Sequence, residues 1–133
     1  MKMEYVYVTS TQNLNIYNNN TWYDFRVTLP KELFFSKSCE CALFSFDTNP
    51  SFQLDVDVFC DVIEETCYKD SLAPFLAKIS GVPYSFIQPN FMKVTNKSVR
   101  NLHFYIKSSF AHTIPTESVE VTQLILLFRE SAL

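Results

Sequence analysis

Apolar and polar side chains alternate along most of this chain, with a repeat of two residues. The clearest case lies between Asn20 and Pro30. There the residues of one face are Tyr23, Phe25, Val27 and Leu29, and those of the other are Asp24, Arg26 and Thr28. A repeat of two is typical of a β-strand with one covered face. Asparagines favour a turn before this strand, and Pro30 is predicted to end it, because proline lacks a backbone donor.

The same alternation recurs at short spacing over the whole sequence, and no segment has the pattern of a long helix. It predicts about eight antiparallel strands. Their expected ranges are Met3–Thr9, Trp22–Leu29, Glu40–Asp47, Phe52–Glu64, Ser71–Ser80, Pro83–Gln88, Val99–Ser108 and Val119–Arg129. A short helix is the alternative for Ser71–Ser80. We expect one all-β domain, residues 1–133, with the architecture of a sandwich or a single jelly roll.

Some segments also predict their position in a sheet. Glu40–Asp47 is fairly apolar on both faces, and so is Val119–Arg129 from Leu124 to Phe128, which is typical of central strands. In Glu40–Asp47 the alternation places Ala42, Phe44 and Phe46 on one face. Pro83–Gln88 lies between prolines, which favours an edge.

Composition narrows the possible functions. The 133 residues are 47% hydrophobic, 16% aromatic and 19% charged, with a net charge of −3. So much aromatic surface and so little charge predict an assembly rather than a monomer. The chain has no basic patch, so direct nucleic-acid binding is not expected. No apolar run approaches the roughly 18 residues of a membrane span, and the first residues do not have the pattern of a signal peptide.

The cysteines are Cys39, Cys41, Cys60 and Cys67. Their spacing lacks the paired short intervals of a structural zinc site, so no metal is predicted. Without a secretion signal, free thiols are expected rather than disulfides. Cys39 and Cys41 fall on the same face of a predicted strand, as two small core residues would.

Enzymatic chemistry has little support in the sequence. Gly81 is the only glycine, whereas phosphate-binding loops and nucleophile elbows need several. The two histidines, His103 and His112, have no serine or cysteine in a context that marks a catalytic triad. We therefore expect no catalytic residues and no cofactor.

Three carboxylates, Asp55, Asp57 and Asp61, share the outward face of the predicted strand Phe52–Glu64, with Phe59 between them. Such a stripe could bind a hard cation or a basic neighbour. The favoured interpretation is nevertheless the solvent-facing side of an ordinary strand, since no loop supplies further oxygen ligands. Phe34, Phe35 and Phe110 fall in predicted connections, where an aromatic residue either anchors a loop or contacts a partner.

Four stretches, in this order, carry a resemblance to one family. They are Asn20-Thr21 through Phe25 to Leu29-Pro30; Glu40-Cys41-Ala42-Leu43; Val58-Phe59-Cys60-Asp61-Val62-Ile63; and Leu124 to Arg129. In these stretches the chain resembles the penton-like minor capsid proteins of Polinton-type elements and related double-stranded DNA viruses. It departs from the family pattern at Cys39, where a tryptophan is usual, and in the shorter sequence between the second and third stretches.

The resemblance implies a single jelly roll and a structural role in a virion, as the pentameric vertex protein beside a major capsid protein. It implies assembly inside the host cell. A ring of this kind has a heterologous interface, for which we expect side chains from different flanks. The candidates are Arg26, Asp55, Asp57, Phe59, Tyr105 and Phe110. A minor cement or trimeric capsid component, and a lectin-like or cytokine-like binding module, are the alternatives.

Overall fold

The computed structural model describes residues 2–53, 55–85, 89–110, 114–115 and 118–131. These residues form strands, turns and loops, and none of them is helical. The strands are β1 (Met3–Thr9), β2 (Asp24–Phe34), β3 (Cys39–Asn49), β4 (Asp55–Cys60), β5 (Thr66–Tyr68), β6 (Ser71–Ala73), β7 (Phe75–Ser80), β8 (Tyr84–Ser85), β9 (Met92–Lys93), β10 (Ser98–Ser108) and β11 (Val121–Glu130). The predicted all-β class is confirmed, and Ser71–Ser80 forms strands rather than a helix.

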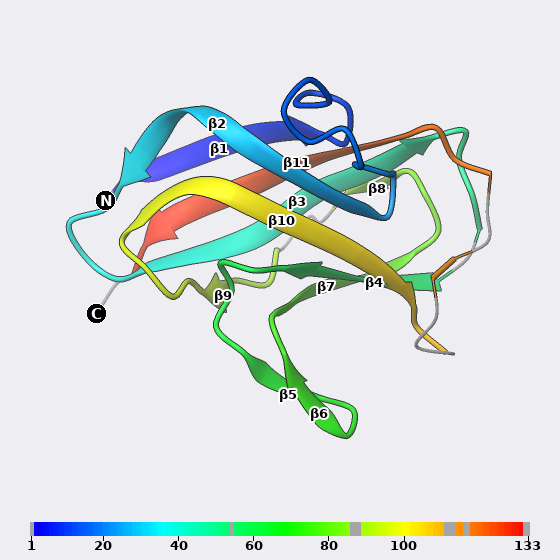
Figure 1. Cartoon of the computed structure of the whole chain (residues 1–133). Helices are drawn as coiled ribbons and strands as arrows, with labels where there is room; N and C mark the ends of the chain where they lie inside the picture. Colours follow the sequence, from blue (N-terminus) through cyan, green and yellow to red (C-terminus); the bar gives the residue numbers. More distant parts are fainter. Residues whose placement is uncertain (1, 54, 86–88, 111–113, 116–117, 132–133) are drawn as a thin grey trace.

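The strands build two antiparallel sheets that pack face to face as a sandwich, with a small hairpin at one side (Figure 1). The first sheet has the order β1-β11-β3-β8, and β9 also pairs with β3. The second sheet has the order β2-β10-β4-β7. The hairpin is β5-β6, which extends from the sandwich next to β4 and β7.

Strands that are distant in the sequence pair in nested order. β1 pairs with β11, β2 with β10, and β4 with β7. Between them, β3 pairs with both β8 and β9, which occupy two parts of the same edge. The chain therefore forms one long antiparallel ribbon, first strand against last, that is bent over on itself into the two sheets. The predictions of central positions for β3 and β11 and of an edge position for β8 are confirmed.

The core lies between the inner faces of the two sheets, and the alternation predicts much of it. Phe25 and Phe104 are fully buried and stack with their ring centroids 5.2 Å apart. Leu102 and Ile106 of β10 are buried on the same side, as predicted. Burying an aromatic or aliphatic side chain of this size contributes about 1.5–3 kcal/mol.

The alternation fails where a strand contains an extra residue. In β3, Ser45 is opposite Ile125 and Leu43 is opposite Leu126, so Phe44 has no partner in the register. A bulge of this kind reverses the order of the two faces. The prediction that Ala42, Phe44 and Phe46 share a face is therefore wrong: Leu43 and Phe46 are core residues, whereas Phe44 lies against Tyr5 on the outer face.

The predicted ends of two strands are also wrong. β2 does not end at Pro30 but continues to Phe34, with a register shift opposite Val99 and Asn101. Proline is tolerated there because β2 is an edge strand with an irregular ladder at this point. β4 ends at Cys60, where a turn begins, rather than continuing to Glu64. The predicted core residue Leu54 lies outside the described residues.

The structure has no disulfide among its four cysteines, in agreement with the expected free thiols. Cys39, Cys41 and Cys60 are buried in the core, and Cys67 on β5 is exposed. Burial, followed by the charges of Glu130 and Glu40, raises the pKa of Cys39 to about 11. Burial also raises the pKa of Cys60. The three buried thiols are therefore protonated core residues, as predicted for Cys39 and Cys41.

Candidate interaction surface

The outer face of the second sheet collects most of the residues that the sequence singles out. β10 crosses this face, and its outward side chains are His103, Tyr105 and Lys107. The antiparallel register places Tyr105 opposite both Asp24 and Phe59, and Lys107 opposite Asp57. Arg26 is opposite His103. Residues from three strands are therefore neighbours on one face.

An aromatic cluster occupies the middle of this face. The rings of Phe59 and Tyr105 are stacked with centroids 4.8 Å apart and an angle of 6° between them. Tyr68, from the β5-β6 hairpin, meets Phe59 edge to face at 4.9 Å. Phe75 on β7 completes the cluster, 5.8 Å from Phe59. Lys107 lies over the ring of Tyr105, with its ammonium 5.4 Å from the centroid, which is within cation–π range.

The hairpin buries this part of the face. Phe59 is 1% exposed and Asp57 is 4% exposed, although both side chains point away from the core between the sheets. The expectation that they face solvent is therefore wrong, because Tyr68 is packed over them. Phe59 and Asp57 contribute to folding of the chain and leave little surface for a partner.

Asp57 has its own donors in this buried position. The hydroxyl of Tyr68 donates a hydrogen bond to Oδ2, and the hydroxyl of Ser109 donates one of 2.9 Å to Oδ1. A buried carboxylate needs such donors, since an unpaired one would be costly. Asp61 is exposed and accepts a 2.9 Å hydrogen bond from the backbone N–H of His103. The three aspartates are thus in different environments, and within the described residues no three His, Cys, Asp or Glu side chains converge to hold a metal ion.

Burial also raises the pKa of both tyrosines in this cluster. For Tyr68 the causes are desolvation first, then the hydrogen bond and charge of Asp57. For Tyr105 they are desolvation first, then the charges of Glu65, Asp61 and Cys60. Both phenols therefore stay protonated at neutral pH, and Tyr68 remains a donor to Asp57.

A polar pocket of about 530 Å³ lies at the β2 side of the same face. Asp24, Arg26 and His103 line it on the sheet, and residues 16–21 of the preceding loop form its other wall. The Oδ1 atom of Asp24 is 2.7 Å from Nε2 of His103. His112, the other histidine of the sequence, lies outside the described residues.

Of the remaining predicted residues, Asp55 and Phe110 lie near the start of β4, and Phe34 and Phe35 lie at the far end of β2. Asp55 is partly exposed, and its carbonyl oxygen accepts a 3.1 Å hydrogen bond from the N–H of Ser109. Phe110 is 77% exposed, with the ammonium of Lys78 5.5 Å from its ring centroid. Phe34 is also exposed, whereas Phe35 is buried against Phe128. The loop aromatics therefore divide into one core anchor, Phe35, and two surface residues.

Sequence reasoning missed a second exposed surface, on the first sheet. The outward side chains of β1 are Met3, Tyr5 and Tyr7, which are 50%, 62% and 59% exposed. Tyr5 contacts Phe44, with the ring centroids 5.5 Å apart. The alternation with Val6 and Val8 predicts that these side chains share a face. It does not predict that no other part of the described chain covers that face.

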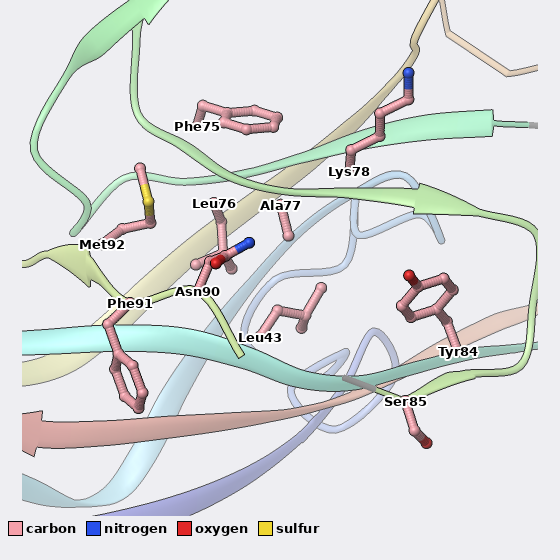
Figure 2. A pocket seen from close by; sticks show the side chains of 10 residues that line it. All are labelled: Leu43, Phe75, Leu76, Ala77, Lys78, Tyr84, Ser85, Asn90, Phe91 and Met92. Atoms are coloured by element: carbon pink, nitrogen blue, oxygen red, sulfur yellow. The ribbon is translucent and has the colours of Figure 1, made fainter. Parts of the chain in front are cut away.

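A pocket of about 840 Å³ lies between β7 and the edge formed by β8 and β9 (Figure 2). Leu43, Leu76 and Ala77 lie near its centre, and Phe75, Lys78 and Tyr84 lie around it. In the sequence, residues 86–88 connect two of its walls and are not among those described. We therefore assign no ligand to it.

Comparison of the chain with protein-family models, with curated proteins and with solved structures gave no significant match. The described part of the chain contains no helix with the length and apolar character needed to cross a membrane.

Proposed function

We propose that this protein is a structural subunit of an icosahedral capsid, in a double-stranded DNA virus or virus-like element, and that its sandwich is a single jelly roll. The observation that carries the proposal is the nested pairing. Counted with β8 and β9 as one interrupted strand, each sheet has four strands, and the first strand of the chain pairs with the last. Such a bent-over ribbon supports a jelly roll, in which two Greek keys share two sheets.

The positions of the four stretches that resemble the penton-like family support the same proposal. Apart from Asn20 and Thr21 in the loop before β2 and a few residues in the turn after β4, they fall on β2, β3, β4 and β11, which are strands of the sandwich. Phe25, Leu43, Val58 and Leu124 are core residues within them. If the chain and the penton-like family have the same fold, the residues they have in common should lie in the core.

The proposed subunit works by shape and burial rather than by chemistry. A rigid β-core holds loops at its two ends, and its flanks pair with neighbouring copies and with a major capsid protein. Exposed apolar side chains at several sites support such contacts. Arg26, Asp55, Tyr105 and Phe110 stay candidate interface residues, whereas the burial of Asp57 and Phe59 removes the support for a role of their side chains in contacts between copies.

The number of copies in solution tests the proposal. Light scattering of the purified chain should give five times the chain mass of 15.5 kDa, and electron microscopy should show five-fold rings. A mass of three chains would favour the trimeric or cement component instead. A stable monomer at micromolar concentration, absent from purified shells, would refute the capsid role.

A matched pair of variants tests which surface forms the ring. Phe110→Ser removes an exposed aromatic at the predicted flank and should reduce the fraction of rings. Leu72→Ser removes a side chain of similar exposure, 63%, from the β5-β6 hairpin and should leave the rings intact. Equal effects of the two substitutions would contradict the predicted position of the interface.

The polar pocket supports a second candidate, a lectin-like binding module. Its carboxylate, guanidinium and amide groups are those that bind sugar hydroxyl groups, and Tyr23 supplies an aromatic ring beside them. Titration with simple sugars, followed by NMR of His103, tests this reading. Specific binding that is lost in Asp24→Ala, by a chain that forms no rings, would favour the lectin-like module over the capsid subunit.

A further inference from the structure

β1 is the edge strand of the first sheet. Its hydrogen bonds with β11 show which residues direct their backbone N–H and C=O groups away from β11. The N–H of Ser10 donates to the carbonyl oxygen of Thr122 on β11 at 2.9 Å, and the carbonyl oxygen of Lys2 accepts from Glu130 at 3.1 Å. In a strand, the N–H and C=O groups of alternate residues point to opposite edges. The even-numbered residues therefore face β11, and the backbone groups of Met3, Tyr5 and Tyr7 point outward.

Other exposed backbone groups near this edge form hydrogen bonds with side chains of the same chain. On β2, the side-chain amide of Asn20 bonds both the N–H and the C=O of Arg26, at 2.9 and 2.8 Å. Asn13 accepts a 2.9 Å hydrogen bond from the N–H of Thr28. On β1 itself, the Oε1 atom of Gln12 accepts a 2.8 Å hydrogen bond from the N–H of Thr9. Open strand edges attract further strands, and these contacts block that pairing.

Between Met3 and Tyr7, no side chain of the described residues forms a hydrogen bond with the outward backbone groups. This window is bounded at one end by Gln12 and at the other by Lys2, whose ammonium donates to the carbonyl oxygen of Phe34. Its length is roughly 17 Å at the usual rise per strand residue. Three consecutive outward residues thus present three donors and three acceptors in the spacing of a β-ladder.

A groove runs beside this window, between the edges of β1 and β2. Its volume is about 190 Å³, and Val6, Leu29, Pro30 and Leu33 contribute apolar walls. Glu4 and Lys31 also line it, so its charges are balanced. Tyr5 and Tyr7 also border the groove, and with Met3 their exposed side chains form an apolar and aromatic surface on the outer face of β1.

We propose that the β1 edge binds an extended peptide segment of another protein, which adds to the first sheet as a further strand beside β1. The segment is uncharged at its centre and carries apolar residues at alternate positions. One set of its side chains enters the groove, and the other set packs beside Met3, Tyr5 and Tyr7. Backbone hydrogen bonds give such strand addition its affinity, and the alternate pockets give it selectivity.

The groove favours a peptide over a second copy of this chain. A second copy would present its own β1, whose inward residues Val6 and Val8 are already buried in their own sandwich. Those side chains cannot also fill the groove of a neighbour. The side chains of an extended peptide are not already buried in a sandwich. Such a peptide can therefore form hydrogen bonds with the β1 backbone and fill the groove at the same time. The inference does not depend on the capsid role.

The experiment selects peptides from a phage-displayed library of random dodecapeptides against the whole chain and measures the affinity of the best peptide by isothermal titration. The key variant is Tyr5→Pro, which removes one outward N–H and no bond to β11, so an edge strand tolerates it. Its matched control is Tyr5→Thr, which removes the ring but keeps the donor. The stability of both variants is checked by urea unfolding.

The proposal expects selected peptides with alternating apolar residues. Their affinity should fall at least tenfold in folded Tyr5→Pro and only a few-fold in Tyr5→Thr, and binding should slow the hydrogen exchange of the Met3, Tyr5 and Tyr7 amides. Selection of no peptide, or equal affinity for Tyr5→Pro and the wild type, would overturn it. So would an oligomer of the wild type that already protects these amides and dissociates in Tyr5→Pro, because the occupant would then be a second copy.

Discussion

The buried hydrogen bond between Tyr68 and Asp57 gives the sharpest test of how the β5-β6 hairpin is held. Tyr68→Phe keeps the ring against Phe59 and removes only the hydroxyl that donates to Asp57. Asp57 is 4% exposed, so water does not readily replace this donor, and the hydroxyl of Ser109 remains as a side-chain donor to Oδ1. Losing a hydrogen bond to a buried charged group costs about 1.5–3 kcal/mol.

Urea unfolding, followed by the fluorescence of the buried Trp22, measures this cost. With a typical slope for a small protein, the midpoint of Tyr68→Phe should fall by roughly 1 M. Tyr5→Phe is the matched control, because it removes the hydroxyl of a tyrosine that is 62% exposed. Its free energy of unfolding should stay within about 0.5 kcal/mol of the wild type.

A double-mutant cycle separates the hydrogen bond from other effects of the substitution. In the Asp57→Asn background the acceptor is neutral, so loss of the Tyr68 hydroxyl should cost only about 1 kcal/mol. An equal cost in both backgrounds, or no cost in the wild-type background, would refute the role of the charged hydrogen bond.

The pH dependence of the same variant follows from the raised pKa of Tyr68. The phenol of the unfolded chain ionises near its ordinary pKa of 10, and the folded phenol ionises at a higher pH. The stability difference between the wild type and Tyr68→Phe should therefore be complete below pH 10 and should shrink as the pH rises above it. A difference that grows with alkaline pH would contradict this direction.

Three further predictions concern the core, an edge and the thiols. Phe25→Ala should lower the free energy of unfolding by about 3–5 kcal/mol, whereas Phe34→Ala, at an exposed position, should change it little in the same urea titration. Asn20→Ala should lower the free energy of unfolding by about 1–2 kcal/mol, because two backbone groups at the β2 edge lose their hydrogen bonds. The control Asn19→Ala, at the exposed neighbouring residue, should change it very little. Iodoacetamide should modify Cys67 rapidly in the folded chain at neutral pH, and mass spectrometry should find the three buried cysteines unmodified until urea unfolds it.

The sequence predicts the sandwich because alternation is a local property that the final packing preserves. In β10 the expected inward residues, Leu102, Phe104 and Ile106, are all buried. The errors in β2 and β3 occur where a register shift interrupts the ladder. A bulge depends on the partner strand, and β3 and β11 are far apart in the sequence. Alternation within one strand therefore cannot reveal that Phe44 is the extra residue.

The candidate surface is harder to predict, because pointing away from the core and being exposed are different properties. Asp57 and Tyr5 both follow the rule of alternation and both point outward from their sheets. Asp57 is buried because the hairpin after β4 brings Tyr68 back over it, whereas nothing in the described chain covers Tyr5. Alternation assigns a face to each residue, but what covers that face is set by segments elsewhere in the chain or by another molecule. An outward apolar strand that the chain leaves open, as in β1, is therefore the place where a partner contributes most to burial, and the backbone direction of that edge specifies that the partner arrives as a strand.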